Sequence, residues 1–229
     1  MAVKNIFLDA GGVILNEEKF EKNMAAIITK ALQKFIPDYT SENYSTDAAE
    51  AVYRFVPRVY NYILYKYIKN TVDFNRARSE CKNEENKNLN NDFTINTGLE
   101  NFLKEKSRYY KIGILGQYGN AMIKFLEQQN LLQYFTFTET QENYKITKPD
   151  PRYFEAVLKT CGCAPEESVM IGDRIDKDII PAKAAGMKTI RLRTGLHINQ
   201  EPRTPDEIPD FTFNCLCDIT MESLKKLNN

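Results

Sequence analysis

Several polar and charged residues follow short apolar runs, at positions where buried strands are expected to end. They are Asp9, Gly116, Gln117, Asp173 and Asp178, together with Lys148 just before a predicted helix start. In open α/β sheets, ligands bind outside the carboxyl ends of the strands, so we expect these groups to lie near one another. Carboxylate oxygens bind hard cations such as Mg²⁺, and a lysine together with helix amino termini neutralises phosphate. The set therefore indicates a site for a divalent cation and a phosphate group.

The clearest of these segments is Ile6–Leu15, in which an apolar run ends at Asp9 and is followed by two glycines and a second apolar run. Its Ile, Phe and Leu residues favour a buried strand of a parallel sheet, and the glycines allow a ligand to approach the backbone. A carboxylate at this position is suited to attack a phosphoryl group or to bind a metal. The segment alone is equally consistent with a strand that ends in a tight turn capped by Asp9.

The composition is that of an ordinary globular protein. The chain has 229 residues, of which 42% are hydrophobic and 27% are charged, which suits one substantial domain or one domain with an insert. Lys+Arg and Asp+Glu are equal at 31 each, so charge gives no reason to expect nucleic acid or an anionic membrane as a partner. No apolar run approaches the length of a membrane-spanning helix, about 20 residues. The N-terminal segment leads into the first strand without a signal-peptide pattern, so we expect a cytoplasmic location.

The distribution of glycine separates two kinds of segment. No glycine lies between Gly12 and Gly98, and this region is rich in residues that favour helices. Within it we predict a helix over 24–35 that ends before Pro37, a helical segment over 46–69 divided by Pro57, and a helix over 73–84 that gives way to a polar loop over 82–91. From residue 97 the pattern alternates between helix and strand, which predicts a doubly wound α/β domain with a parallel sheet.

The predicted elements after residue 97 follow one another closely. We predict strands over 110–115, 135–138, 168–171, 188–192 and 211–215, and helices over 99–106, 121–129, 151–161, 176–185 and from 219 onward. Asp150 is the expected N-cap of the helix that begins at Pro151, and Gly162 is expected to end it. The segment 196–210 is expected to be a surface loop, in which His197 has no predicted role.

Two further patterns each have a functional and a structural interpretation. Tyrosines interleaved with Arg and Lys over 53–67 suggest stacking on bases, but their helical spacing and the balanced charge favour packing. The pairs Cys161/Cys163 and Cys215/Cys217 lack the Cys-x-x-Cys spacing typical of zinc sites, so we expect free thiols. Cys215 and Cys217 lie on the alternating apolar face of the last predicted strand, which predicts small core residues.

Four motifs, in order, resemble those of the haloacid dehalogenase (HAD) superfamily of aspartate-nucleophile hydrolases. The first is an apolar strand followed by Asp-x-Asp-Gly-Thr/Val, and the second is a strand that ends in Ser or Thr. The third is a Lys-Pro helix start, and the fourth is Gly-Asp with a further Asp five positions after the first. The matching segments are Leu8–Val13, Ile114–Gln117, Lys148–Pro151 and Gly172–Asp178. The resemblance extends over essentially the whole chain.

The resemblance implies a Rossmann-like α/β core and an inserted cap. The core would comprise residues 1–15 and 93–229, and an all-α cap of the C1 type would comprise residues 16–92. The implied activity is that of a Mg²⁺-dependent phosphatase of a small phosphorylated metabolite. Asp9 would attack phosphorus and form an aspartyl-phosphate, which water then hydrolyses.

The resemblance also implies a role for each matched residue. Mg²⁺ would be held by Asp9, the backbone carbonyl of Gly11 and Asp173. Lys148 would stabilise the charge on Asp9 and on the phosphoryl oxygens, and Asp178 would orient Lys148 and the water molecules of the metal. Phosphate would be bound by Gly12, Gly116, Gln117 and Lys148.

Two departures from the family pattern bear on turnover. Gly11 replaces the second carboxylate of the first motif, which protonates the leaving group, and losing general acid catalysis typically costs about 10²–10⁴-fold in rate. Gly116 replaces the hydroxyl residue of the second motif. The alternatives to a phosphatase are therefore a catalytically degraded binding protein and, with less support, a carbon–halogen hydrolase. Dehalogenases tend to lack the metal-binding carboxylate that Asp173 supplies.

Overall fold

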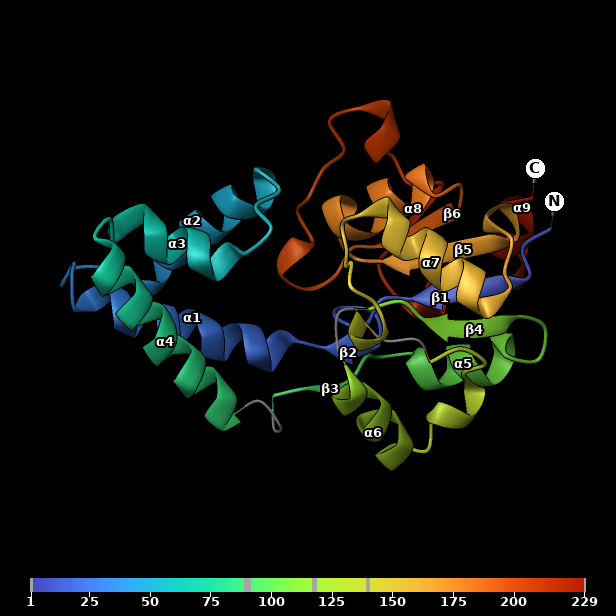
Figure 1. Ribbon diagram of the computed structural model, residues 1–229, viewed down its shortest axis with the longest axis horizontal. Helices are drawn as coiled ribbons and strands as arrows, with labels where there is room; N and C mark the ends of the chain where they lie inside the picture. Colours follow the sequence, from blue (N-terminus) through green and yellow to red (C-terminus); the bar gives the residue numbers. More distant parts are fainter. Residues whose placement is uncertain (1, 89–91, 117–118, 139–140, 229) are drawn as a thin grey trace. The chain divides into compact units, whose positions relative to one another are not determined.

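A computed structural model describes residues 2–88, 92–116, 119–138 and 141–228 (Figure 1). The chain forms two compact units. Unit 1 comprises Met1–Asn16 and Ile95–Asn229, and unit 2 comprises Glu17–Thr94. The sequence places these boundaries after residues 15 and 92, and the structure places them after residues 16 and 94. The short strands β2 (Leu15–Asn16) and β3 (Thr94–Ile95) pair with each other where the chain passes from one unit to the other.

The described part of unit 1 contains a five-stranded parallel sheet with strand order β4-β1-β5-β6-β7. In its register, Leu8 is opposite Ile114 on one side and Ile171 on the other. The segments that follow β1, β4 and β5 therefore leave the sheet at one edge. The fold confirms the predicted doubly wound α/β class. The strands are β1 (Asn5–Leu8), β4 (Lys111–Ile114), β5 (Ser168–Gly172), β6 (Lys188–Leu192) and β7 (Phe211–Phe213).

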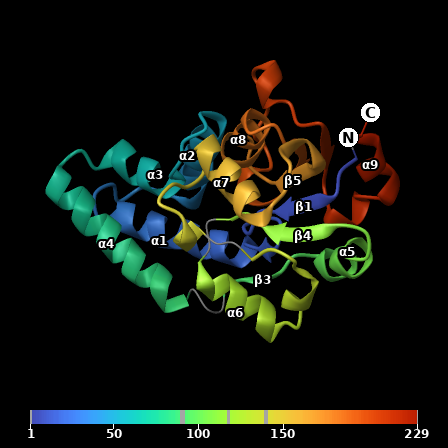
Figure 2. The same ribbon diagram turned by 45° about the vertical axis from the view of Figure 1, so that its right-hand side comes forward.

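Both faces of the central strands are covered by packed side chains. Every residue of β1 and β5 is buried, although successive side chains point to opposite faces of a strand. On one face, Phe7 and Met170 share a core cluster with residues of α7 (Pro151–Cys161) and α8 (Ile180–Ala184), and both helices lie along the sheet in the two views of Figures 1 and 2. Burial on both faces is typical of parallel sheets with helices on each side.

Helix α7 begins and ends as the sequence predicts. The side chain of Asp150 accepts a hydrogen bond from the backbone N–H of Arg152 at 3.0 Å, and Gly162 ends the helix in the left-handed conformation with φ 63°. The other helices of unit 1 are α5 (Leu99–Lys106), α6 (Asn120–Gln128) and α9 (Met221–Lys226). Shorter helical turns are Leu132–Tyr134, Gln141–Asn143, Pro165–Glu167, Ile175–Ile179, Gly195–His197, Pro205–Glu207 and Leu216–Asp218.

The strand predicted over 135–138 is wrong. Phe137 forms an isolated bridge with Gly113 and no longer ladder. The amides of Thr136 and Phe137 both donate to the carbonyl of Ile112, at 2.7 and 3.1 Å. The carbonyl of Phe137 accepts a hydrogen bond from the N–H of Ile114 at 3.1 Å, so the described part of this segment pairs with β4 in a single parallel bridge and forms no strand.

The prediction of free core thiols at Cys215 and Cys217 is also wrong. These two residues form a disulfide, and Cys217 is exposed. Strand β7 ends at Phe213, so the two-residue alternation on which the prediction rested stops before either cysteine. Leu216, which lies between them, is buried instead. Cys161 and Cys163 are free thiols, as predicted.

In its described residues, unit 2 consists mainly of helices. They are α1 (Glu18–Gln33), α2 (Ser41–Tyr53), α3 (Val59–Tyr67) and α4 (Thr71–Asn88). Pro57 separates α2 from α3, as predicted. The predicted polar loop over 82–91 is wrong as far as residue 88, because α4 continues through it; residues 89–91 lie outside the described residues. Ion pairs three residues apart, Lys82–Glu85 at 2.7 Å and Lys87–Glu84 at 2.6 Å, stabilise this polar end of the helix.

Some tyrosines of segment 53–67 have partners within unit 2. The Tyr60 hydroxyl donates to Glu21 Oε2 at 2.8 Å, and the ring of Tyr67 lies 5.2 Å from the ring of Tyr39. Tyr53 is instead exposed. Packing and hydrogen bonding within the unit therefore account for Tyr60 and Tyr67.

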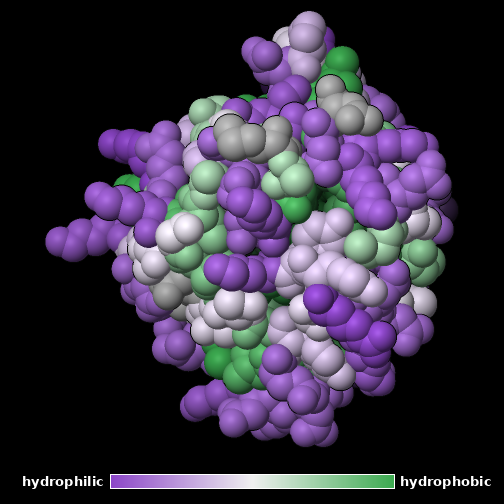
Figure 3. Space-filling view, turned by 90° about the vertical axis from the view of Figure 1, so that its right-hand side faces the viewer, coloured by the Kyte–Doolittle hydropathy of each residue, from purple (hydrophilic) through white to green (hydrophobic). Residues whose placement is uncertain are grey.

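The face of the molecule shown in Figure 3 is mostly hydrophilic, with small separate apolar areas between charged side chains. Large contiguous apolar areas are typical of interaction surfaces, and the coloured residues of this face do not form one. In the described part of the chain, no helix has the length and apolar character that crossing a membrane requires.

His197 is the only histidine of the chain, and it is buried. Burial lowers the pKa of its imidazole to about 3, and the positive charge of Arg174 acts in the same direction. In the unfolded chain the same histidine has a pKa of about 6.5. The contribution of the buried, neutral imidazole to the free energy of unfolding is therefore complete above about pH 6.5 and is lost as the pH falls toward 3. We expect the imidazole proton signals, followed by NMR, not to titrate between about pH 8 and about pH 5. A midpoint near the unfolded value would contradict the buried placement.

Candidate active site

Lys148 lies between two carboxylates at the edge of the sheet where the strands end. Its Nζ is 2.7 Å from Asp9 Oδ1 and 2.6 Å from Asp178 Oδ1. The side chains of Lys148 and Asp178 are each 1% exposed, whereas that of Asp9 is 14% exposed. The group is therefore buried on the side of Asp178 and reaches solvent at Asp9.

Asp173 adds a third carboxylate to this group. Asp9, Asp173 and Asp178 each offer an oxygen, and the three oxygens lie within 4.8 Å of one another. Buried negative charges are costly unless cations compensate them, and Lys148 supplies a single positive charge. Oxygen ligands of this kind are those that Mg²⁺ prefers. The donor set therefore fits a divalent cation, and the structure brings the four predicted charged residues together.

Glycines allow the acidic segments to approach this closely. A Cβ on Gly172 would lie 2.3 Å from Cβ of Asp178, and a Cβ on Gly12 would lie 3.0 Å from Cγ of Asp173. Gly12 also has φ +68°, which favours glycine. Gly11 is buried in an isolated bridge with Leu15 and provides no side-chain acid beside Asp9.

Three contacts that the sequence pattern does not reveal hold the site in place. Asn96 Nδ2 and Thr194 Oγ1 both donate to the carbonyl of Gly12, at 2.6 and 2.9 Å. The backbone N–H of Arg174 donates to Asp178 Oδ2 at 3.0 Å. Thr194 follows the end of β6, so its position after a strand is a signal that could have identified it. Asn96 lies in a segment between elements and carries no such signal.

The buried charges shift one another's pKa values. Burial, and after it the charge of Asp9, raise the pKa of Asp178 to about 6 against the opposing effect of Lys148. Burial disfavours the charged form of Lys148, but the carboxylates of Asp178 and Asp9 outweigh it and raise its pKa above the ordinary value. Lys148 is therefore an ammonium at neutral pH, which suits a group that faces phosphoryl oxygens.

Gly116 lies where the second motif ends, and the backbone of the first motif packs against it. A Cβ at this position would lie 2.7 Å from Cβ of Ala10 and 3.0 Å from its backbone nitrogen. The hydroxyl-bearing side chain of the family pattern therefore does not fit here without displacement of Ala10. Gln117, the other predicted phosphate-binding residue of this motif, lies outside the described residues.

We expect Gly116→Ser to destabilise the protein and not to raise its activity. Insertion of atoms into packed regions typically costs about 1–3 kcal/mol, which lowers the midpoint of thermal unfolding by roughly 2–12 °C for a chain of this size. Thermal unfolding of Gly116→Ser, Gly116→Ala and the double variant Ala10→Gly/Gly116→Ser tests the cause, because removing the Ala10 methyl should recover part of the loss. A gain of activity specific to the serine, without loss of stability, would contradict this packing.

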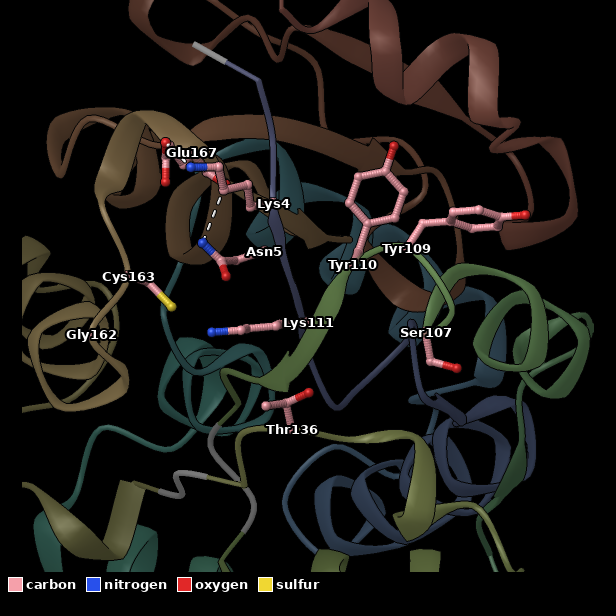
Figure 4. Close-up of a pocket in the computed structure, with 10 residues that line it drawn as sticks. All are labelled: Lys4, Asn5, Ser107, Tyr109, Tyr110, Lys111, Thr136, Gly162, Cys163 and Glu167. Carbon is pink, nitrogen blue, oxygen red and sulfur yellow. Dashed lines mark hydrogen bonds and ion pairs between the residues drawn. The ribbon is translucent and has the colours of Figure 1, made fainter.

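A hollow of about 540 Å³ lies at the opposite end of the sheet (Figure 4). Lys4 and Asn5 line it where β1 begins, and Lys111 lines it where β4 begins. Glu167 is the one carboxylate among the ten described lining residues, and it pairs with Lys4 at 2.6 Å. The hollow therefore lacks the carboxylate cluster, and the candidate active site is at the other edge.

Residues 6–192 match the family model described as haloacid dehalogenase-like hydrolase. The chain belongs to this family. The match includes Ile6–Leu8 of the first strand, the four motifs and the segment that forms unit 2, and it confirms the resemblance inferred from the motifs.

Individual relatives resemble parts or the whole of this HAD-like chain. Over 87 residues it is 41% identical to a glyceraldehyde 3-phosphate phosphatase of Methanopyrus kandleri, and the match covers 37% of each chain. The chain spans less than half the length of the curated relatives it matches.

Two solved structures resemble the whole chain. A crystal structure of a predicted phosphoglycolate phosphatase from Haemophilus somnus has a TM-score of 0.69 at 19% identity, and the match covers 94% of this chain and 96% of that chain. A magnesium-bound HAD hydrolase from Bacillus subtilis has a TM-score of 0.65 at 16% identity and covers 100% of both chains. At these identities the two structures show a common fold.

Proposed function

We propose that this chain is a Mg²⁺-dependent phosphatase that acts on a small phosphorylated metabolite through an aspartyl-phosphate at Asp9. The observation that carries the proposal is Lys148, held at 2.7 Å from Asp9 and 2.6 Å from Asp178 beside the carboxylate of Asp173. This arrangement offers a nucleophile, a fixed positive charge and a cation site around one small volume.

The proposed reaction has two chemical steps. A carboxylate oxygen of Asp9 attacks phosphorus, the ester bond to the leaving oxygen breaks, and an acyl phosphate forms on Asp9. Water then attacks phosphorus, inorganic phosphate leaves, and the carboxylate is regenerated. Lys148 stabilises negative charge on Asp9 and on the phosphoryl oxygens, and Asp178 fixes the position of the ammonium. Asp9, the carbonyl of Gly11 and Asp173 would hold Mg²⁺, whose positive charge stabilises the transferring phosphoryl group.

The absence of a side chain at Gly11 bears on the class of substrate. The leaving oxygen receives its proton from water, because no carboxylic acid stands at this position. An ester whose leaving group is already a weak base, such as a sugar 1-phosphate or an aryl phosphate, needs that proton less. Relatives named as phosphatases of glyceraldehyde 3-phosphate, phosphoserine and dihydroxyacetone phosphate support a small phosphorylated metabolite as the substrate class. We propose further that unit 2 is the cap that selects among such substrates.

Phosphate release from a panel of small phosphoesters, with and without Mg²⁺, tests the proposed activity. We expect release that requires Mg²⁺, with aryl and sugar 1-phosphates cleaved faster than alkyl phosphates of similar size. Equal rates for good and poor leaving groups would contradict the role assigned to Gly11. Release that persists after chelation of divalent cations would contradict the metal site.

A phosphate-binding protein without turnover is the second candidate, and two residues favour it. Gly11 offers no acid, and the close contact between Gly116 and Ala10 leaves no space for the hydroxyl of the second motif. In that case Mg²⁺ and inorganic phosphate should bind, with no release from any ester of the panel. A carbon–halogen hydrolase has less support, because Asp173 joins a carboxylate cluster that suits a cation.

A further inference from the structure

We propose that Gln200 is a positioning residue that fixes the loop carrying Asp173 and Asp178, and with it the geometry of the cation site. The inference rests on the proposed function, since that function gives the loop its task. Gln200 lies 27 positions after Asp173, in a segment for which the sequence predicts only a surface loop. Its side chain is completely buried.

Both polar atoms of the Gln200 amide bind the middle of the segment 173–178, here called the acidic loop, which includes the start of the helical turn Ile175–Ile179. Its Oε1 accepts a hydrogen bond from the backbone N–H of Ile175 at 2.7 Å, and its Nε2 donates to Asp176 Oδ1 at 2.9 Å. A buried amide is costly unless its hydrogen bonds are made. Here each half of the amide has a partner on the same loop, so the side chain holds that loop at two successive residues.

The contacts within the loop transmit this restraint to the carboxylate of Asp178. Asp176 forms an ion pair with Arg174, with Oδ2 2.6 Å from the Arg174 guanidinium. The backbone N–H of Arg174 in turn donates to Asp178 Oδ2 at 3.0 Å. A shift of Asp176 would therefore move Arg174, and through it the carboxylate that holds Lys148.

The buried side chain of Arg191 fixes the backbone segment that carries Gln200. The backbone N–H of Gln200 donates to the carbonyl of His197 at 3.0 Å. Arg191 of β6, which is 2% exposed, donates to that same carbonyl at 3.0 Å and to the carbonyl of Asp173 at 3.4 Å. The segment 197–200 is thus tied to the central sheet and acts as a fixed support against which the acidic loop is placed.

Partners that orient metal ligands typically contribute 10- to 100-fold to metal affinity or activity. Gln200 acts through Asp176 and not on a proposed metal ligand directly. We therefore expect Gln200→Met, which keeps the length of the side chain and removes both hydrogen bonds, to weaken Mg²⁺ binding toward the lower end of this range, by about 10-fold. Mg²⁺ affinity is measured by calorimetric titration of the full chain and by the rise in thermal midpoint with Mg²⁺ concentration. The Mg²⁺ concentration for half-maximal phosphate release is measured in parallel.

A matched control distinguishes an effect on the position of the acidic loop from a general loss of stability of the fold. Asn5 is also a buried amide; it donates to Ser168 Oγ and to the carbonyl of Glu167 at the opposite end of the sheet (Figure 4). Asn5→Leu should lower the thermal midpoint about as much as Gln200→Met and leave Mg²⁺ affinity unchanged. A structural role alone would give both variants the same profile.

Exchanging the amide and the carboxylate between positions 200 and 176 tests whether their contact is the cause of a loss of Mg²⁺ affinity. Gln200→Glu keeps the acceptor for Ile175 and places a carboxylate against Asp176, so we expect Mg²⁺ affinity to fall. The double variant Gln200→Glu/Asp176→Asn restores a donor and an acceptor between the two positions. It also replaces the Arg174–Asp176 ion pair with a neutral contact, so we expect it to recover only part of the affinity lost in Gln200→Glu. Recovery in the double variant would support the contact itself as the cause.

Unchanged Mg²⁺ affinity in Gln200→Met, or an equal loss in Asn5→Leu, would overturn the inference. Normal Mg²⁺ binding by the wild-type chain without phosphate release would refute the phosphatase and leave the Gln200 inference to be decided by the titrations. Failure of the wild-type chain to bind Mg²⁺ would overturn both.

Discussion

Asp9→Asn will reduce phosphate release by at least about 10³-fold, the scale on which removal of a nucleophile acts in other hydrolases. The asparagine amide has the shape of the carboxylate and can still accept a hydrogen bond from Lys148, but its oxygen is a poor nucleophile at neutral pH. The variant should therefore fold and lose the first chemical step. Initial rates of phosphate release at saturating Mg²⁺ provide the measurement.

The matching control for Asp9→Asn is its thermal stability, and because Asp9 is also a proposed Mg²⁺ ligand, its rate is compared with wild type at a Mg²⁺ concentration that saturates the variant. The charge of Asp9 contributes to the raised pKa of Asp178, so removing it relieves some repulsion within the cluster and should not destabilise the fold. An Asp9→Asn protein that is folded and retains most of its activity would exclude Asp9 as the nucleophile.

Lys148→Met will be the most destabilising single substitution in the site. It leaves Asp178, which is 1% exposed, without the ammonium at 2.6 Å, and breaking a buried pair by removing one partner typically costs about 3–5 kcal/mol. For a chain of this length, that loss lowers the thermal midpoint by roughly 6–20 °C. Thermal unfolding without divalent cations is the appropriate measurement, because bound Mg²⁺ would compensate part of the excess negative charge.

Two variants show whether the lost pair is the cause. Lys111→Met removes an exposed lysine at the opposite edge of the sheet and should leave the midpoint nearly unchanged. Lys148→Met/Asp178→Asn removes both charges of the buried pair and should be more stable than Lys148→Met alone. If Lys148→Met unfolds at the wild-type temperature, the buried ion pair does not have the role described here.

The sequence allowed the fold class and the charged residues of the site to be predicted, because both depend on local patterns. Asp9 and Asp173 each end an apolar run, and parallel strands end at a common edge, so their convergence follows from topology. The start of α7 was predictable in detail, since Asp150 and Pro151 are typical cap and first-turn residues. Pro57 likewise marked the division between α2 and α3.

The remaining features depend on contacts between distant segments. Gln200 and Asn96 lie in segments without periodicity. Their partners lie far away in the sequence, and two of them, the N–H of Ile175 and the carbonyl of Gly12, are backbone groups that no side-chain pattern reveals. Helix α4 extends to Asn88 because ion pairs stabilise a polar segment whose composition resembles that of a loop. The disulfide between Cys215 and Cys217 depends on where β7 ends, which the alternating pattern did not predict.

The most direct test of the central claim is to trap the phosphorylated carboxylate. The wild-type chain is mixed with Mg²⁺ and the best substrate of the panel, quenched in acid within the first turnover and reduced with borohydride, which converts an acyl phosphate to an alcohol. Peptide mass analysis then locates the reduced residue. The account predicts reduction at Asp9, dependent on both substrate and Mg²⁺. Phosphate release with Asp9 unmodified throughout, or with reduction at another carboxylate, would contradict it.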